Sequence, residues 1–339
     1  MQSAPLKSHR PSTARGLGPQ GTAKGTPSSR PVLVTGGTGF LGSHVVARAR
    51  AAGRAVVGVG RADGDLLDLP QAERLLRGVR PRAVIHLAAL VGGIGIHHSR
   101  AGELVRDNVL LGLNVLEAAR LAGVQNVILA GTAAAYPASA PVPSKEEDLD
   151  QGLPAGSSRP YAMAKRTVEE AHRGYRSQYG LSGGTLVLTN LFGPGDHFGA
   201  EASHVVAALV PRFVDAADSG DSTVRVWGTG LPTRDFLYVE DGAEAVLRAV
   251  DVLDSEVPVN VGSGRETSIA ELARAVALAA GFKGAIDFDT TKPDGAPRRA
   301  LDVGRAEEVL GFKAETTLED GLRRTVASYR TARDHAPPP

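Results

Sequence analysis

A tyrosine and a lysine four residues apart, Tyr161 and Lys165, are the side chains whose spacing most directly suggests chemistry. Pro160 precedes them and suits the first turn of a helix, where side chains four apart lie on one face. A phenol ordinarily has a pKa of about 10, and a neighbouring ammonium stabilises phenolate and lowers that value. The pair is therefore a candidate acid–base group for a hydroxyl or a ketone, whereas on an arbitrary helix it would be ordinary surface.

Thr132 is a second candidate, because it ends the apolar run 126–131 and is followed by three alanines. The run is typical of a buried strand, so the hydroxyl is expected at the carboxyl end of a strand. Threonine can donate a hydrogen bond there, although its branched side chain is stiffer than that of serine.

A glycine-rich turn precedes both features. The β-branched run 32–35 predicts a strand, Leu41, Val45, Val46 and Ala49 follow at helical spacing, and the glycines between them form the pattern G-x-x-G-x-x-G. Such a turn allows a pyrophosphate to approach the backbone at a helix N-terminus. The pattern predicts a dinucleotide site rather than a plain turn, with contacts from Gly36, Gly39, Phe40, Leu41 and Gly42. An oxidised nicotinamide there would further favour the phenolate of Tyr161.

The second predicted strand ends at Gly60-Arg61, where NAD sites usually have an acid. Arg61 can pair with a 2′-phosphate, which favours NADP, but the nearby Asp63 leaves NAD as the alternative. A solvated surface arginine is the other interpretation of Arg61. The remaining predicted cofactor contacts are Asp65 and Leu66 at the adenine edge, and Ala88 and Ala89 in the run 82–90.

Further strands within 82–90 and 126–132, with a helix at 108–122 between them, indicate an α/β fold. We expect a Rossmann-type doubly wound parallel sheet, with ligands at the carboxyl ends of its strands, and a smaller C-terminal α/β substrate domain. The expected boundaries are a disordered tail at 1–30, the NADP-binding domain at 31–190 with a return at about 235–265, the substrate domain at 191–330 and a tail at 331–339.

The composition limits the partners and the chemistry. The 38 basic and 37 acidic side chains nearly cancel, so bulk charge predicts neither a nucleic-acid nor a membrane partner. The chain contains no cysteine, which excludes disulfides, zinc thiolates and thiol nucleophiles and is typical of the cytoplasm. No metal site is predicted. The acid-free start also resembles a transit peptide, but its prolines and glycines argue against an amphipathic helix.

In this order, "GGTGFLG", Thr132 and "YAMAK" resemble the extended short-chain dehydrogenase/reductase superfamily, whose members include the NAD-dependent epimerase/dehydratase family. The stretches "HLAALVGGIG", "TNLFGPGDHFGAEASHVVAALVPRF", "VWGTGLPTRDFLYVED" and "KPDGAPRRALD" are similar to the GDP-L-fucose synthase family, NADP-dependent epimerase/reductases of a 4-keto-6-deoxymannose. The resemblance covers about residues 31–330. It implies a homodimer paired through the helices at 108–122 and 161–178.

The resemblance also assigns roles. It implies that Tyr161 donates a proton to the C4 oxygen, that Lys165 assists it and that Thr132 replaces a family serine. His204 matches the family's epimerisation acid, but Ala134 stands where the family has a cysteine, which argues against full 3,5-epimerisation. A one-base exchange by His204, His97 or His98 is the alternative, although we expect the last two to be loop histidines.

For the substrate, the resemblance implies that Arg212 and Arg234 clamp a nucleotide diphosphate, a task suited to guanidinium groups. Trp227 is either a pocket wall or a core residue, and Asn190 could hold the sugar or the diphosphate. Arg298 is the candidate that reaches the nucleotide, with its neighbour Arg299 as the alternative.

We therefore expect a nucleotide-sugar epimerase/reductase that transfers hydride at sugar C4, by NADP(H)-dependent reduction of a GDP-linked 4-keto-sugar. The first alternative is a C4 epimerase of a hexose or heptose that passes through a 4-keto intermediate. The second is a dinucleotide-binding module without catalysis, which the retention of Tyr161, Lys165 and Thr132 disfavours.

Overall fold

A computed structural model describes residues 30–198, 204–292 and 294–335, so the predicted N-terminal tail lies outside the described residues except for Arg30. Its centre is a six-stranded sheet in the order β2-β1-β3-β4-β5-β9, in which every neighbouring pair is parallel. The strands are β1 (Val32–Thr35), β2 (Val56–Val59), β3 (Ala83–His86), β4 (Asn126–Thr132), β5 (Ser182–Leu188) and β9 (Val259–Val261).

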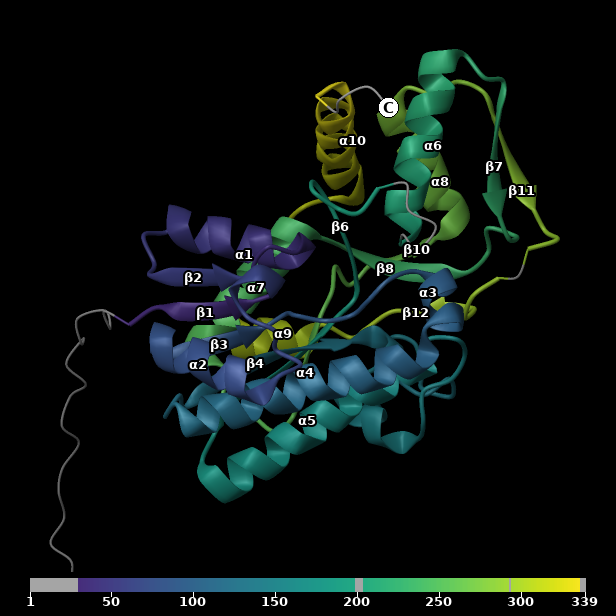
Figure 1. The fold of residues 1–339 in the computed structure, drawn as a ribbon. Helices are drawn as coiled ribbons and strands as arrows, with labels where there is room; N and C mark the ends of the chain where they lie inside the picture. The colour runs from purple at the N-terminus through teal and green to yellow at the C-terminus, as the bar shows by residue number, and fades with distance from the viewer. Residues whose placement is uncertain (1–29, 199–203, 293, 336–339) are drawn as a thin grey trace, which may run out of the picture.

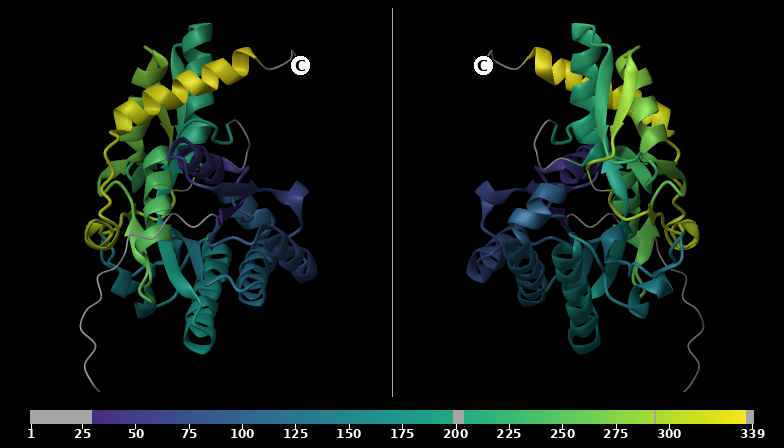
Figure 2. Two further views of the ribbon diagram at one scale, coloured as in Figure 1. Left: turned by 90° about the vertical axis from the view of Figure 1, so that its left-hand side faces the viewer. Right: turned by 90° about the vertical axis from the view of Figure 1, so that its right-hand side faces the viewer.

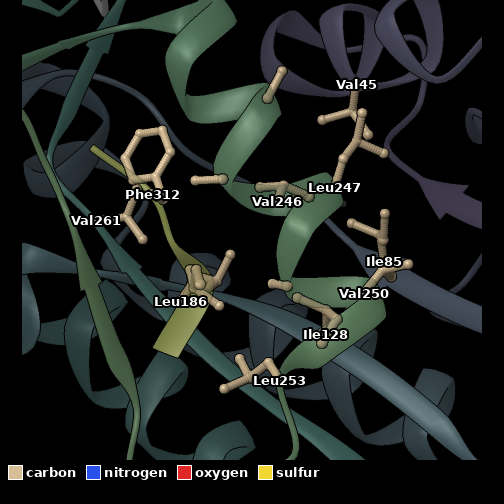
Figure 3. Close-up of a cluster of buried hydrophobic side chains, with 14 of the residues drawn as sticks. Val45, Ile85, Ile128, Leu186, Val246, Leu247, Val250, Leu253, Val261 and Phe312 are labelled. Atoms are coloured by element: carbon tan, nitrogen blue, oxygen red, sulfur yellow. The ribbon is translucent and has the colours of Figure 1, made fainter. Parts of the chain in front are cut away.

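Helices cover both faces of this sheet (Figure 1). One face carries α2 (Leu69–Val79), α4 (Ala101–Leu121) and α5 (Arg159–Tyr179), and the other carries α1 (Phe40–Ala51), α7 (Val239–Val252) and α9 (Gly304–Leu310). Figure 3 shows the core between the sheet and α1, α7 and the chain after α9, with Val45, Ile85 and Val250 among its side chains. Burial on both faces explains why the strands are continuously apolar, and it confirms the predicted doubly wound parallel sheet.

A second region lies beside the sheet, as the two views of Figure 2 show. Here β8 (Thr233–Tyr238) pairs with β10 (Glu266–Ser268), β12 (Arg298–Arg299) and β6 (Asn190–Phe192), while β7 (Thr223–Trp227) pairs with β11 (Ala285–Asp289). The helices α6 (Val205–Ser219), α8 (Ile269–Ala280) and α10 (Leu318–Asp334) pack around a separate core that includes Phe213, Phe282 and Leu322.

The chain returns to the first region more often than the sequence predicts. Besides α7 and β9, which fall within 235–265, Ala306, Leu310 and Phe312 also pack against the core of the large sheet. The predicted tail from 331 is also too long, because α10 continues to Asp334. Arg333 near its end pairs with Asp215 and Asp218 of α6, at 3.2 and 2.7 Å, which holds the last turn in place.

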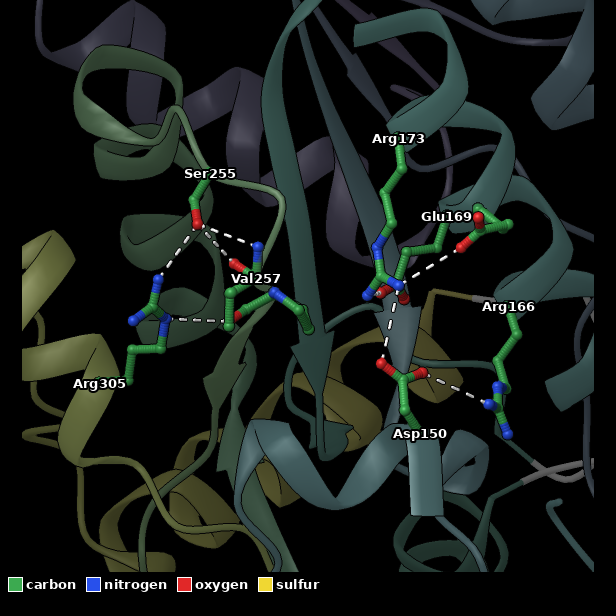
Figure 4. A network of polar contacts seen from close by, with 9 residues as sticks. Asp150, Arg166, Glu169, Arg173, Ser255, Val257 and Arg305 are labelled. Atoms are coloured by element: carbon green, nitrogen blue, oxygen red, sulfur yellow. Dashed lines mark hydrogen bonds and ion pairs between the residues drawn. The ribbon is translucent and has the colours of Figure 1, made fainter. Parts of the chain in front are cut away.

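Polar contacts fix α5, the helix that carries Tyr161. Asp150 lies in a 3₁₀ turn (Glu146–Gln151) within 3.7 Å of Arg166 and 3.8 Å of Arg173, and Arg173 also pairs with Glu169 at 2.9 Å (Figure 4). Exposed ion pairs of this kind contribute little free energy individually. Together they hold the loop that follows β4 against the outer face of α5.

Candidate active site

The three glycines of the turn after β1 have different surroundings. Gly36 has a φ of +68°, and a Cβ there would lie 2.8 Å from the amide nitrogen of Ala88. A Cβ on Gly42 would lie 2.0 Å from the carbonyl oxygen of Gly36. Beside Gly39, in contrast, only that same oxygen lies within 4 Å, at 3.2 Å. Gly36 and Gly42 are therefore required by packing, whereas the space beside Gly39 is open to a ligand.

The helix α1 begins directly after Gly39, and no side chain caps its N-terminus. The amides of Phe40, Leu41 and Gly42 form the first turn, where N–H groups have no partner within the helix. Open space beside Gly39 and unpaired donors at a helix N-terminus are what a pyrophosphate requires. These residues fit a dinucleotide phosphate.

The residues predicted to contact the adenosine ribose follow β2. Arg61 is exposed and begins a 3₁₀ turn (Arg61–Asp63), while the carboxylate of Asp63 accepts a hydrogen bond from the Gly60 amide at 2.8 Å. Asp65 is likewise held within its own loop, where it accepts from the Leu67 amide at 3.0 Å. Because the acid is bound to its own turn and the arginine is exposed, the arrangement favours a 2′-phosphate over a free ribose hydroxyl.

Ala88 and Leu66 hold the chain near the glycine turn and β2 through backbone contacts and packing. The Ala88 amide donates to Thr35 Oγ1 at 3.4 Å, which keeps the chain after β3 close to the glycine turn. Leu66 is buried, and its carbonyl oxygen accepts from Asn114 of α4 at 2.9 Å. Ala89 follows Ala88 directly and is partly buried.

Tyr161, Lys165 and Thr132 come from neighbouring elements, the first turns of α5 and the carboxyl end of β4. The Lys165 ammonium lies 5.7 Å from the centroid of the Tyr161 ring. Thr132 Oγ1 accepts from the Ala134 amide at 3.2 Å, and this hydroxyl still has a proton to donate. Hydroxyl, phenol and ammonium therefore share one edge of the sheet.

Burial controls the protonation of this group. It raises the pKa of Tyr161 above its ordinary value and lowers the pKa of Lys165 to about 8. The expectation that the ammonium lowers the pKa of the phenol is therefore wrong for the protein by itself, because loss of hydration of the phenolate is the larger effect. Tyr161 holds its proton at neutral pH.

Two polar residues that the sequence analysis did not select lie beneath Lys165. His86 and Asn108 line a small cavity with Gly131 and Lys165. Burial and, to a smaller extent, the charge of Lys165 lower the pKa of His86 to about 3, so the ring is neutral. It shares a hydrogen bond with Thr35 Oγ1 at 2.8 Å. Asn108 bonds both the amide and the carbonyl of Leu90, at 3.1 and 2.9 Å, which fixes the chain that follows β3.

That chain leads into a short helix, α3 (Ile94–Ser99), where the sequence predicted a loop. The prediction was therefore wrong for His97 and His98, which lie in α3 near the meeting of the two regions (Figure 1). The ring of His97 contacts Tyr161 edge to face, with centroids 5.9 Å apart, whereas His98 is exposed. Only the first of the two histidines therefore belongs to the site.

His204 immediately precedes α6, not on a helix face but at the N-cap position. His204 is exposed as a residue, but the protein around its imidazole removes water from the ring and lowers its pKa. The charge of the nearby Asp196 partly opposes this shift. His204 in turn lowers the pKa of His97, so the two rings, from different regions of the fold, are electrostatic neighbours.

Trp227 is 61% exposed, so it is not a core residue. Arg212 and Lys292 lie over its ring, with the guanidinium carbon and the ammonium nitrogen 5.7 and 5.6 Å from the indole centroid. An exposed indole flanked by two cations suits a planar base that carries phosphates. Lys292 was not selected from the sequence, since a lone lysine in a polar loop gives no signal.

Arg234 and Arg299 face each other across β8 and β12, where they are paired in register. Burial and the charge of Arg299 lower the pKa of Arg234 to about 10, and burial lowers the pKa of Arg299. Arg234 Nη1 donates to the carbonyl oxygens of Thr233 and Ala296, at 2.6 Å each, and two partly buried guanidiniums side by side favour an anion near them. Arg298, the predicted residue, is instead exposed and bound through Nε and Nη2 to Glu266, at 2.7 Å each.

Asn190, at the start of β6, donates to the Asp235 carbonyl at 2.9 Å, so its amide is already used in joining β6 to β8. Among the described residues, no group of three or more His, Cys, Asp or Glu side chains could hold a metal ion. Nor does this part of the chain contain a helix long and apolar enough to cross a membrane.

The chain is similar in sequence and in structure to proteins of one enzyme family. Residues 32–262 match the model of the NAD dependent epimerase/dehydratase family. A GDP-L-fucose synthase of Sinorhizobium fredii is 36% identical over 298 residues, which cover 88% of this chain and 95% of that protein. The crystal structure of a GDP-L-fucose synthetase from Naegleria fowleri bound to NADP is 31% identical, with a TM-score of 0.83, and covers 91% and 95% of the two chains.

A second solved structure is a GDP-6-OMe-4-keto-L-xylo-heptose reductase from Campylobacter jejuni. It is 25% identical, has a TM-score of 0.85, and covers 91% of this chain and 99% of its own. The similar proteins thus include both an enzyme named as a synthase and one named as a reductase.

Proposed function

Because the chain belongs to the NAD dependent epimerase/dehydratase family, we propose that it reduces the C4 ketone of a nucleotide-diphosphate 4-keto-sugar, with GDP as the nucleotide. The protein is an NADP-dependent nucleotide-sugar enzyme of the epimerase/reductase type. The names of its relatives support the GDP-linked substrate.

The observation that carries the reductase proposal is the placement of Tyr161, with Lys165 5.7 Å from its ring, beside the carboxyl end of β4 that bears Thr132. Burial raises the pKa of the Tyr161 phenol. A phenol that holds its proton at neutral pH is suited to donate it to a ketone oxygen as that oxygen becomes negative. NADPH, when bound, would supply the hydride to C4. Thr132 donates a second hydrogen bond to the same oxygen, and the charge of Lys165 stabilises the phenolate that remains.

The alternative of a C4 epimerase asks more of the same tyrosine. Its first step oxidises C4, so Tyr161 must begin as a base and give up its proton before the sugar arrives. The second half of that cycle returns the hydride to C4 and uses Tyr161 as an acid again, so both reactions need the same side chain. The two reactions differ in whether NADPH is consumed.

For substrate binding, we propose Arg234 and Arg299 as the diphosphate clamp, with Trp227, Arg212 and Lys292 at the nucleobase. Arg299 takes the role first expected of Arg298, whose guanidinium is bound to Glu266. Asn190 remains a proposed substrate contact, although its side-chain amide already donates to the Asp235 carbonyl. Buried Ala134 cannot exchange protons, so cysteine-dependent 3,5-epimerisation is not part of the proposal.

We further propose a cytoplasmic homodimer paired through α4 and α5, which pack against each other. Val105 and Leu110 of α4 are exposed by 40% and 38%, which supports a partner on this helix. Light scattering after size-exclusion chromatography should give twice the mass of 35.1 kDa.

The test of the function uses 4-keto forms of GDP-, ADP-, UDP- and dTDP-sugars with NADPH or NADH. We expect one NADPH oxidised for each GDP-4-keto-sugar reduced, with slower use of NADH. Product formation without NADPH consumption would support the C4 epimerase instead. Turnover confined to a UDP-sugar would contradict the assignment of the nucleotide.

A further inference from the structure

His97 has a chemically unusual position for a residue that hydride transfer does not use. Its ring is 5.9 Å from that of Tyr161, at an interplanar angle of 64°. Its Nδ1 is buried and has no hydrogen-bond partner among the described residues. A buried polar atom left without a partner costs free energy unless a ligand supplies one.

The protonation of His97 suits a base. Burial is the main cause that lowers its pKa, and the neighbouring imidazoles of His204 and His98 add to this, while the Gly92 backbone works in the opposite direction. At neutral pH the ring is therefore neutral, with one nitrogen free to accept a proton.

His204 has a different environment. Burial lowers the pKa of His204, and the charge of Asp196 opposes this shift without reversing it. Asp196 has a carboxylate oxygen that is buried with no hydrogen-bond partner among the described residues. Two neutral imidazoles that approach from α3 and from the start of α6 are an arrangement in which one ring can remove a proton and return it.

The contact of His97 with Tyr161 limits which substrate atoms His97 could reach. If the Tyr161 hydroxyl bonds the C4 ketone oxygen, the proposal requires that a carbon bonded to C4 lie within reach of the His97 ring. Hydrogens on such a carbon are acidic because the enolate that forms is stabilised through the same ketone oxygen.

We propose that His97 is a catalytic base of this site, which with His204 exchanges the proton on a carbon next to the C4 ketone before reduction. This rests on the proposed 4-keto-sugar substrate. The C–H bond breaks, its proton passes to an imidazole nitrogen, and its electron pair forms the enolate that Tyr161 holds. Protonation of the same carbon by His204, or by His97, restores the ketone, so no oxidant or reductant is needed.

The test separates proton exchange from hydride transfer. GDP-4-keto-6-deoxymannose is incubated in D₂O with the full chain and NADP⁺, which has no hydride to give, and deuterium at C3 and C5 is followed by NMR against a sample without protein. We expect incorporation by the unaltered protein and a loss of at least about 100-fold in His97→Asn.

His98→Asn is the matched control, since it removes the exposed neighbouring histidine from the same helix, and it should exchange within about twofold of the unaltered protein. His97→Gln provides a second variant should His97→Asn fail to fold, as judged by circular dichroism and NADPH fluorescence. Exchange by either His97 variant at the unaltered rate would overturn the inference.

The same samples are assayed for NADPH-dependent reduction. Reduction by the unaltered protein without any deuterium incorporation would overturn the role of His97 alone. Absence of reduction would instead contradict the proposed function.

Discussion

Tyr161 is the residue on which the proposed reduction depends, because burial raises the pKa of its phenol and keeps it protonated at neutral pH. Tyr161→Phe should lower the rate of ketone reduction by about 10²- to 10⁴-fold, the usual contribution of a positioned acid. NADPH binding, measured by fluorescence, should change little. Tyr179→Phe, which alters an exposed tyrosine of the same helix, is the control; equal rates in the two variants would refute the assignment.

Lys165 illustrates a conflict between stability and function at a single residue. Its folded pKa of about 8 lies below the ordinary lysine value of about 10.4, so the buried ammonium costs stability at neutral pH. Lys165→Met should therefore raise the free energy of unfolding at pH 7 by up to about 3 kcal/mol while abolishing reduction.

Because the folded pKa is the lower one, this gain should shrink as the pH rises from 8 to above 10, where the lysine is neutral in both states. Urea unfolding at several pH values measures it, with the exposed Lys313→Met as the control. A Lys165→Met protein with a lower free energy of unfolding than the unaltered protein at pH 7 would contradict this prediction.

Two adjacent arginines allow an equally sharp comparison. Arg299 faces Arg234, and no acidic group contributes to its pKa shift. Arg298, in contrast, forms an ion pair with Glu266. Loss of a charged hydrogen bond to a phosphate costs about 1.5–3 kcal/mol. Arg299→Ala should therefore raise KM for the nucleotide sugar by roughly 10- to 100-fold, and Arg298→Ala by less than about threefold. Steady-state kinetics with the reverse order would restore the original assignment.

At the scale of elements, the turn between β1 and α1 separates packing from ligand binding. A Cβ at position 42 would clash with the Gly36 carbonyl, so Gly42→Ala should destabilise the fold. Gly39→Ala adds a methyl group that the protein itself nearly accommodates, at 3.2 Å from the same oxygen. It should keep its melting temperature within a few degrees and yet lose most NADPH affinity. Calorimetry and NADPH titration measure both; a Gly39 variant that binds normally would contradict the cofactor position.

This turn could be predicted because its strand, glycines and helix are consecutive in the sequence. The short helix α3 could not be predicted from the sequence, because its six residues include Gly95, show no helical period and follow two further glycines. The approach of His97 to Tyr161 depends on the packing of α3 against α4, which no local pattern records. The sequence left the choice between Arg298 and Arg299 open for another reason: adjacent strand residues point to opposite faces, so an uncertainty of one residue exchanges their roles.

At the scale of the whole molecule, the candidate site draws on both regions of the fold. The large sheet contributes the glycine turn, Thr132, Tyr161 and Lys165, while the second region contributes His204 and the arginines of β8 and β12. The alternation of strands and helices predicted the first region well. The second region is built from short strands far apart in sequence, and the return of Phe312 to the first core is a tertiary contact without a periodic signature.

The central claim is that a hydride reaches C4 while Tyr161 supplies the proton to its oxygen. The most direct measurement uses NADPH deuterated at C4 of the nicotinamide with a GDP-4-keto-sugar, followed by mass spectrometry and NMR of the product. The account predicts one deuterium per product molecule, bound to sugar C4, and none transferred by Tyr161→Phe on the same time scale. Product without deuterium at C4, or deuterium transfer that persists undiminished in Tyr161→Phe, would contradict it.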